Sequence, residues 1–172
     1  MADYKWTKWD FFWNIAMTIL CIVCFPANPL VFCGIITTDS YPVLFIIGWI
    51  IWVIGMVLVM APIIMFPRRG GVPRGKPFIH TTRLVDTGIY AVVRHPQYIG
   101  GILAIFVTTL LWYPHWLFGL LGVIGSVIIY LGSFKEDEHL IWQFGDKYIQ
   151  YMQKVPRFNI ISGIVRLQRH NR

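Results

Sequence analysis

The sequence predicts an all-α fold: a polytopic membrane helical bundle with four to five transmembrane helices. Three observations support this prediction. Of the 172 residues, 56% are hydrophobic and 13% are charged, about half the charged fraction of an average soluble domain. The apolar residues also fall in long blocks, and residues 42–66 contain no charged side chain. As a helix that rises about 1.5 Å per residue, this block can cross a hydrocarbon core of roughly 30 Å.

Four apolar segments follow one another along the chain. The first covers about residues 11–36, and two prolines near its middle should break a helix there, so that five helices are as tenable as four. The second covers residues 42–66, and the fourth roughly residues 115–134. The third, residues 98–112, would rise only about 22 Å as a helix, which is short for a span unless it begins deep in the membrane.

The Lys and Arg residues indicate the orientation of the bundle. Six of the 15 lie within residues 67–96 and seven within residues 135–172, while Lys5 and Lys8 precede the first apolar segment. With four spans, all of these segments fall on one side of the membrane, which the positive-inside rule assigns to the cytoplasm. The net charge of +7 then indicates topology and contact with membrane lipids, and it requires no nucleic-acid partner.

Two polar segments are expected on that side. A Gly- and Pro-rich loop at residues 68–77 leads into residues 78–93, which show no clear period. Within residues 140–155, apolar side chains recur at steps of three and four, which predicts an amphipathic helix that is bent at Gly145 and lies on the cytoplasmic face. The two segments should meet beneath the short third helix, and we therefore expect a site there.

The cysteines do not predict a metal site. Cys21 and Cys24 have the spacing of half such a site, but Cys33 is the remaining cysteine and no second Cys or His pair accompanies them. The three thiols are interpreted as small buried hydrophobes. The N-terminal apolar run is longer than that of a signal peptide and has no small-residue cleavage site. The sequence contains no GxGxxG or P-loop motif, which excludes a soluble nucleotide-binding fold.

The tripeptide Arg94-His95-Pro96 stands directly before the third apolar segment. Pro96 is suited to the first turn of a helix, so the free N–H groups of Gln97 and Tyr98 should point into the loop and favour an anion. His95 and Tyr98 add polar side chains at the same place. A snorkelling arginine and a capping histidine at a membrane boundary would explain the tripeptide equally well.

Two further groups of residues are candidates for chemistry. Glu136, Asp137 and Glu138 follow the fourth apolar segment. At a helix start such residues are ordinary dipole partners, but a carboxylate there can also bind ribose hydroxyls or an ammonium group. Arg157 follows Pro156, and its guanidinium can bind either a lipid phosphate or a substrate carboxylate.

Over residues 76–158 these motifs occur in a fixed order: Thr82-Arg-Leu-Val-Asp-Thr-Gly-Ile-Tyr90, Arg94-His-Pro-Gln-Tyr-Ile-Gly100, Glu136, Phe144-Gly145, Tyr148, Tyr151 and Val155-Pro-Arg157. The pattern resembles the isoprenylcysteine carboxyl methyltransferase family and, more broadly, the membrane methyltransferases that include the phospholipid methyltransferases. The resemblance implies two parts, a membrane hairpin at residues 1–66 and a methyltransferase core at residues 67–172. The core would hold the cytoplasmic loop, two membrane helices and the C-terminal helix.

The resemblance also implies a cofactor, S-adenosylmethionine, which leaves as S-adenosylhomocysteine. Its adenosine side would be lined by Arg83, Leu84, Val85 and Tyr90. Its amino-acid end would be held by His95, Pro96, Gln97 and Tyr98. Glu136 would fix it from the far wall, with Glu138 as the alternative because the acidic cluster permits a shift in register. The implied catalytic residues are Glu136 and Arg157.

The implied reaction is methylation of the C-terminal carboxylate of an isoprenylcysteine, or of a similar lipid-borne acceptor, at the cytoplasmic membrane face. The membrane would be the endoplasmic reticulum in a eukaryote and the plasma membrane in a prokaryote. A carboxylate is already a nucleophile at neutral pH and needs no general base. Gly132 stands where the eukaryotic enzymes carry a substrate-linked arginine, which leaves the acceptor open. The alternatives are a phospholipid amine N-methyltransferase, an NADPH-dependent sterol-type reductase, and a non-catalytic scaffold or transporter.

Overall fold

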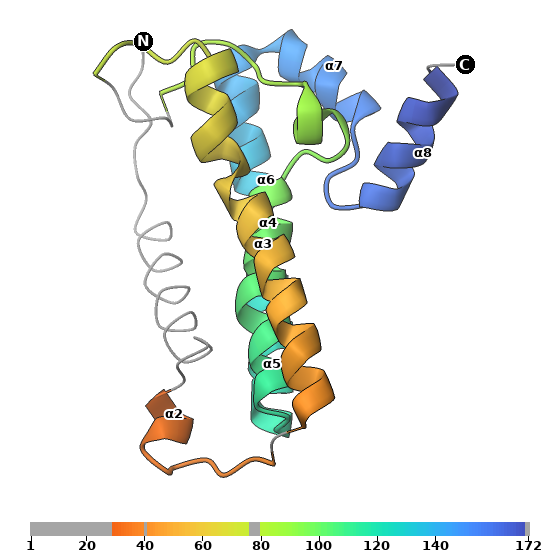
Figure 1. Ribbon diagram of the computed structural model, residues 1–172. Helices are drawn as coiled ribbons and strands as arrows, with labels where there is room; N and C mark the ends of the chain where they lie inside the picture. The colour runs from red at the N-terminus through yellow and green to blue at the C-terminus, as the bar shows by residue number, and fades with distance from the viewer. Residues whose placement is uncertain (1–28, 40, 76–79, 171–172) are drawn as a thin grey trace. The chain divides into compact units, whose positions relative to one another are not determined.

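The computed structural model describes residues 29–39, 41–75 and 80–170, and all regular structure within them is helical (Figure 1). This confirms the all-α prediction for the described residues. Cys21, Cys24 and residues 25–28 of the predicted break in the first apolar segment lie outside them, and Pro29, the second proline of that break, is the first described residue. In chain order the helices are α2 (Pro29–Phe32), α3 (Pro42–Arg69), a 3₁₀ turn (Gly88–Ala91), α4 (Pro96–Gly101), a π-helical turn (Ile102–Val107), α5 (Thr108–Trp112), α6 (Trp116–Phe144), α7 (Asp146–Lys154) and α8 (Ile160–His170).

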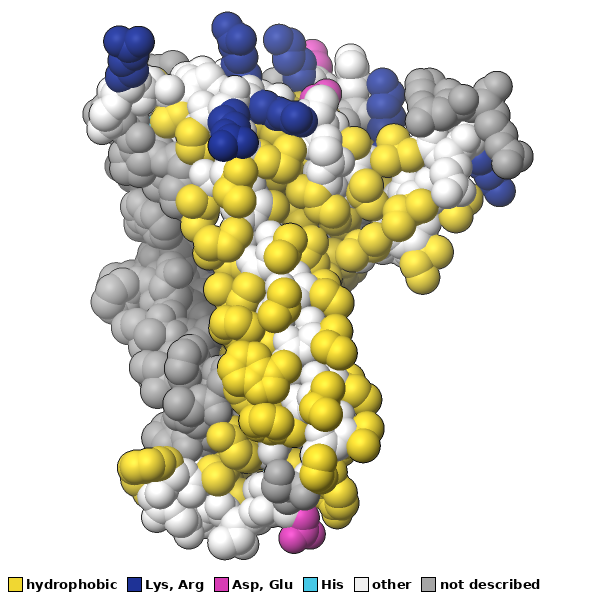
Figure 2. All heavy atoms as spheres, in the orientation of Figure 1, with side chains coloured by type: hydrophobic (Ala, Val, Ile, Leu, Met, Phe, Trp, Pro, Cys, Tyr) yellow, Lys and Arg dark blue, Asp and Glu magenta, His cyan; other side chains and the backbone are white. Residues whose placement is uncertain are grey.

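Two of these helices, α3 and α6, are long and apolar enough to cross a membrane. Their most apolar stretches have mean hydropathies of 2.8 and 2.1, yet only 11% and 17% of those stretches are buried. Figure 2 shows the hydrophobic side chains on the outside of α3. Surfaces of this kind are stable in lipid and costly in water. The structure thus supports a membrane protein, while the predicted number of four or five spans remains untested.

The third and fourth apolar segments differ from their predicted limits. The third is helical from Pro96 to Trp112, which confirms Pro96 as a helix start, but its middle is a π-helical turn. The fourth does not end near residue 134, because α6 continues to Phe144. Residues 136–138 therefore lie inside a helix, and the expectation that they begin one is wrong. Lys and Glu are good helix formers, so the change from apolar to charged residues does not end the helix.

The described chain forms two compact units. Among the described residues, the first unit contains those within 29–52 and 102–128, and the second contains those within 53–101 and 129–170. In the first unit the Trp112 indole donates a hydrogen bond of 3.2 Å to the carbonyl of Phe45. Cys33, which we expected to be buried, is exposed in the turn after α2. The predicted division at residue 66 remains a prediction.

The second unit contains the expected site. Its α4 packs closely on α3, because a side chain at Gly100 would lie 2.5 Å from the carbonyl of Gly55. The predicted amphipathic helix is the end of α6 followed by α7, with the expected bend at Gly145, where φ is +60°. Tyr148 and Tyr151, on the buried face of α7, form a small core with Val155, in agreement with the pattern of apolar residues.

The last helix, α8, is an amphipathic helix that the sequence pattern did not predict. The side chain of Asn159 accepts a hydrogen bond from the backbone N–H of Ser162, which caps the helix start. Gly163 lies against the carbonyl of Val92, where any side chain would overlap. Ile161 and Ile164 are exposed, at 76% and 44%. The helix therefore packs against Val92 through Gly163, while the apolar side chains of Ile161 and Ile164 are exposed.

Candidate functional site

The centre of the site is Asp137 on α6, which is 3% exposed. Its carboxylate accepts hydrogen bonds from the Arg94 guanidinium (3.0 Å), from the Arg157 guanidinium (3.1 and 2.7 Å) and from the Tyr148 hydroxyl (2.5 Å). Nε2 of His95 lies 2.9 Å from the same carboxylate. We refer to these five residues as the Asp137 clasp. They come from four segments of the second unit, so the carboxylate ties those segments together.

Backbone hydrogen bonds reinforce the clasp. The N–H of Arg94 donates to the carbonyl of Pro156 (3.0 Å), and the N–H of His95 donates to that of Arg157 (3.4 Å). The Arg157 guanidinium also lies 3.6 Å from the centre of the Phe134 ring. Arg157 is thus held by a carboxylate and by an aromatic face at once, an arrangement that suits its planar cation. These contacts fix its side chain within the protein.

Glu136, the neighbour of Asp137, is in a different state. One of its carboxylate oxygens, Oε2, is buried without a hydrogen-bond partner among the described residues. That oxygen lies 3.6 Å from Nδ1 of His95. The ring of Tyr98 stacks on His95 at 5.3 Å between centres and 11° between planes, and its hydroxyl lies against Glu136. We refer to Glu136, His95 and Tyr98 as the Glu136 group.

The Asp137 clasp determines what His95 offers to this group. The negative charge of Asp137 already faces the two guanidinium groups of Arg94 and Arg157. Nε2 of His95 lies 2.9 Å from this carboxylate, so the ring nitrogen that faces the Glu136 group is Nδ1. Nδ1 and the buried oxygen Oε2 of Glu136 lie 3.6 Å apart, beyond hydrogen-bond distance. A buried carboxylate oxygen without a hydrogen-bond partner is stabilised by a donor or a cation placed beside it.

The structure brings several of the predicted cofactor residues together. Tyr90 is buried; its hydroxyl lies 3.5 Å from the amide oxygen of Gln97, and its carbonyl accepts a hydrogen bond from Tyr151. Burial is the main factor that raises the pKa of Tyr90, so its hydroxyl remains a neutral donor. Pro96 and Val85 are buried as well. Glu138, by contrast, is exposed, which favours Glu136 over it as the carboxylate of the site.

One sequence-based expectation is wrong. The N–H of Tyr98 was expected to be free for an anion, but it donates to the carbonyl of His95 at 3.2 Å. The same carbonyl accepts from the N–H of Ile99. Since His95 precedes the first helical residue, its carbonyl is in position to take up N–H groups of the first turn. The start of α4 therefore offers one donor fewer to a ligand than we expected.

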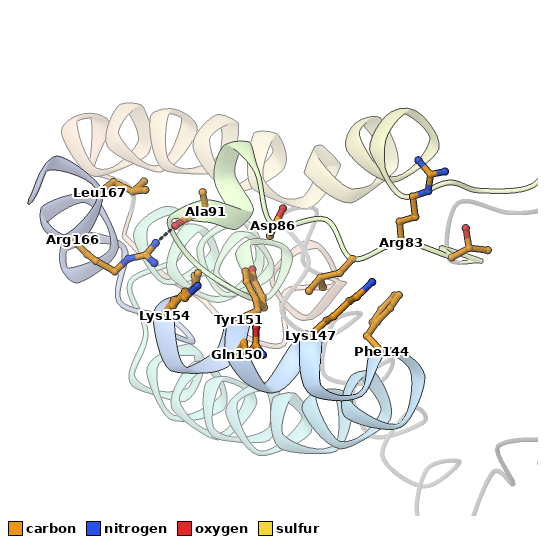
Figure 3. A pocket seen from close by; sticks show the side chains of 13 residues that line it. Arg83, Asp86, Ala91, Phe144, Lys147, Gln150, Tyr151, Lys154, Arg166 and Leu167 are labelled. Carbon is orange, nitrogen blue, oxygen red and sulfur yellow. Dashed lines mark hydrogen bonds between the residues drawn. The ribbon is translucent and has the colours of Figure 1, made fainter. Parts of the chain in front are cut away.

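A cavity of about 640 Å³ opens elsewhere in the second unit (Figure 3). Residues 82–91 form one wall, and α7 with the end of α6 and α8 form the others. Arg83 and Leu84, predicted for the adenosine side of the cofactor, line this cavity. None of the three residues of the Glu136 group does so. The predicted cofactor residues are thus distributed over two places.

Sequence reasoning missed Asp137, Arg94 and Tyr148 as members of one buried cluster. A signal for Asp137 was present, because Leu140, Phe144 and Tyr148 follow it at helical steps of 3, 7 and 11. These positions belong to the buried side of α6 and α7. In the described part of the chain, no three His, Cys, Asp or Glu side chains are placed to hold a metal ion.

The long apolar helices, and the polar cluster that joins residues 94–96 to the charged part of α6, define a class of protein. This class is a membrane protein with a polar site beside its apolar segments. The sequence profile of the phospholipid methyltransferase family matches residues 43–147, more than half of the chain. The chain belongs to this family, which confirms the predicted membership of the broader membrane methyltransferase group.

Two curated relatives are similar to the chain. The methanethiol S-methyltransferase of Pseudomonas deceptionensis is 30% identical over 117 residues, which cover 65% of this chain and 42% of the relative. Methanethiol S-methyltransferase 1 of Bradyrhizobium diazoefficiens is 37% identical over 67 residues, which cover 39% of this chain and 22% of the relative. The matches span less than half the length of either relative. No solved structure matches the chain significantly.

Proposed function

We propose that this protein is a membrane methyltransferase that uses S-adenosylmethionine and binds the amino-acid end of this cofactor at the Glu136 group. One observation carries the proposal: Oε2 of Glu136 is buried without a hydrogen-bond partner among the described residues, 3.6 Å from Nδ1 of His95. Membership of a methyltransferase family supports the methyl-transfer reaction.

The cofactor fits this arrangement by its charge. Its amino-acid end carries an ammonium group, which would donate to Oε2 of Glu136 and offset its negative charge. The ring of Tyr98 stacks on His95 next to Glu136, and an aromatic ring stabilises a nearby cation such as a sulfonium. The contact of Nε2 with Asp137 fixes the ring of His95, and with it the position of Nδ1 beside Glu136. Tyr90 was predicted for the adenosine side and Gln97 for the amino-acid end, and the contact between their side chains supports placing the two ends of the cofactor side by side.

S-adenosylmethionine, when bound, supplies a methyl group on a positively charged sulfur. The residues of the chain then have to bind, orient and exclude water, since an in-line displacement is accelerated mainly by proximity and alignment. Glu136, His95 and Tyr98 perform these tasks in the proposal. Arg157 acts as a positioning residue through Asp137, because the clasp already holds its guanidinium.

For the methyl acceptor we propose a small thiol. The two arginines of the Asp137 clasp, Arg94 and Arg157, are both paired with Asp137. An acceptor carboxylate would have to compete with Asp137 for them. A thiol can bind in its neutral form and lose its proton afterwards, so its binding requires no such cation. The curated relatives are named for a thiol, methanethiol, which supports the same choice. The prenylcysteine carboxylate and the amine of phosphatidylethanolamine, expected from the resemblance alone, are the rival acceptors.

We also propose that the site faces the cytoplasm. All Lys and Arg residues that the structure describes lie in the second unit, together with the Glu136 group, and several of them are visible in Figure 2. Segments that are rich in Lys and Arg remain on the cytoplasmic side of membranes.

The test is methyl transfer by the detergent-purified full chain, with S-adenosylmethionine labelled on the methyl group. Methanethiol, a farnesylated cysteine and phosphatidylethanolamine serve as acceptors in parallel. We expect label in the thiol product, at a rate that rises with pH towards the thiol pKa because the thiolate is the nucleophile. A pH-independent rate with the farnesylated cysteine would replace the thiol by a carboxylate. Binding of NADPH but not of S-adenosylhomocysteine would overturn the methyltransferase proposal.

A further inference from the structure

We propose that the cavity between residues 82–91, α7 and α8 is a second binding site, which takes a phosphate-bearing anion such as the headgroup of an anionic phospholipid. Its volume of about 640 Å³ lies in the range of small-molecule sites. The proposal goes beyond the methyl-transfer reaction and does not depend on it. It rests on the charges that line the cavity and on the position of α8 beside it.

The cavity gathers positive charge. Four basic side chains line it, and Asp86 is the acidic side chain among its lining residues. In the part of the chain that the structure describes, none of the four forms an ion pair. The four are Arg83, Lys147, Lys154 and Arg166. Like charges that line one cavity repel one another, and an anion bound between them removes this repulsion.

Arg166 is the best-positioned of these cations. One of its terminal nitrogens donates to the carbonyl of Ala91, which anchors the side chain at the cavity wall (Figure 3). Its Nε is buried and has no hydrogen-bond partner among the described residues. Figure 3 shows Lys154 beside it, with Tyr151 next along the wall and Lys147 beyond. An anchored guanidinium with a donor to spare is well suited to a phosphate oxygen.

The charge of the cavity distinguishes it from the proposed cofactor site. S-adenosylmethionine carries two positive groups and one negative group, so a strongly basic cavity repels its reactive end. The Glu136 group, which contains a carboxylate with an unpaired oxygen, lines no part of this cavity. The two places therefore select ligands of opposite charge.

The helix that supplies Arg166 also indicates why the anion should be a lipid headgroup. Ile161, Ile164 and Val165 of α8 are 76%, 44% and 40% exposed, while Arg166 and Leu167 line the cavity. An amphipathic helix of this kind lies in the membrane interface with its apolar side towards the acyl chains. Its basic residues are then at the depth of the headgroups, where basic pockets bind anionic lipid.

The experiment is calorimetric titration of the detergent-purified full chain with three probes: short-chain phosphatidylglycerol, glycerol 3-phosphate and glycerophosphocholine. We expect the lipid to bind most tightly and the zwitterionic probe least. Lys154→Gln and Arg166→Gln should each weaken phosphatidylglycerol binding about tenfold, through the loss of one charged contact. Arg169→Gln is the matched control, since it makes the same change on α8 at a residue that does not line the cavity. Its effect should stay within about twofold.

The results of these titrations distinguish a lipid site from a soluble-phosphate site, a diffuse basic surface and the adenosine side of the cofactor site. Equal binding of glycerol 3-phosphate and of the lipid would keep the anion site and make its natural ligand a soluble phosphate. An equal loss in Arg169→Gln would overturn the proposal in favour of a diffuse basic surface. Displacement of the probe by S-adenosylhomocysteine would also overturn it, because the cavity would then be the adenosine side of the cofactor site. Because Arg166 also contacts Ala91, Lys154→Gln and Lys147→Gln test the proposal without disturbing that anchor.

Discussion

Asp137 and Glu136 are neighbours on α6 and differ in almost every physical respect. Asp137 is 3% exposed, and hydrogen bonds from two arginines and a tyrosine reach its carboxylate. Glu136 is more exposed, and its buried oxygen has no partner among the described residues. Successive residues on a helix point about 100° apart, so one carboxylate enters the packed interior while the other stays at its edge. The first is suited to hold the fold, and the second is suited to bind a ligand.

Because the two carboxylates differ in this way, removing one should lower stability and removing the other should lower ligand affinity. A buried carboxylate that is removed leaves its cationic partners unpaired in a medium of low dielectric constant. A carboxylate at the edge of a site leaves little behind in the free protein, and its loss appears mainly when a cationic ligand binds. Stability and ligand affinity should therefore respond to different substitutions.

The largest effect is expected for Asp137→Asn. This substitution preserves the size of the side chain but leaves the guanidinium groups of Arg94 and Arg157 without a counter-charge. We expect a loss of about 3–5 kcal/mol in the free energy of unfolding, the usual result of breaking a buried ion pair. Chemical unfolding in detergent, followed by circular dichroism, measures it.

Two variants serve as controls for this prediction. Glu136→Gln should unfold like the wild type, since no hydrogen bond reaches the carboxylate oxygen that faces His95. Arg157→Ala should lose stability as Asp137→Asn does, because it removes two of the hydrogen bonds of the clasp. Wild-type stability of Asp137→Asn would mean that the clasp does not hold the fold.

The second prediction concerns ligand affinity. Glu136→Gln should weaken the binding of S-adenosylhomocysteine by about 1–3 kcal/mol, because the ammonium group of the ligand loses a charged acceptor. Calorimetric titration of the purified protein measures the loss. The same substitution at Glu138 tests the alternative residue. Since Glu138 is exposed, it should change affinity far less, and an equal loss in both variants would place the ligand elsewhere.

The buried faces of these helices could be predicted from the sequence, because the spacing of apolar residues indicates which face of a helix is buried. The pattern of Leu140, Phe144 and Tyr148 predicted the buried side of the end of α6 and of α7, and Gly145 marked the break between them. Pro96 marked the start of α4 in the same way. These are local signals, and the structure agrees with them.

The state of each acidic residue could not be obtained in this way. The sequence shows three consecutive acidic side chains. Whether each of them is buried and paired depends on partners from distant segments such as Arg94 and Arg157. The end of α6 was also misplaced, because the change from apolar to charged residues indicates the edge of the membrane rather than the end of the helix. Long-range pairing and helix continuation are properties of the folded chain, and one sequence alone does not report them.

A third, smaller effect is expected for Tyr148→Phe. The hydroxyl of Tyr148 is one of several donors to Asp137, and the two arginines remain when it is lost. We expect a loss of about 1 kcal/mol in the free energy of unfolding, the usual net value of one hydrogen bond. The affinity for S-adenosylhomocysteine should stay unchanged. A loss of affinity as large as that of Glu136→Gln would show that the clasp and the Glu136 group act as one unit.

The smallest effect is a dependence of stability on alkaline pH. Burial, and then the hydrogen bond to Asp137, raise the pKa of Tyr148 above its ordinary value of about 10. The folded state therefore favours the neutral phenol, and the resulting stability is present below about pH 10 and is lost as the pH rises towards the pKa of the folded state. Burial raises the pKa of Tyr90 and of Tyr151 in the same direction.

Melting temperatures of the wild type and of Tyr148→Phe, measured from about pH 8 to about pH 11, test this dependence. The melting temperature of the wild type should fall above about pH 10, and that of the variant should fall less steeply. Some decline should remain in the variant, because Tyr90 and Tyr151 still favour the neutral state. Identical slopes of melting temperature against pH would mean that ionisation of Tyr148 does not affect the stability of the folded state. The clasp would then depend on its arginines alone.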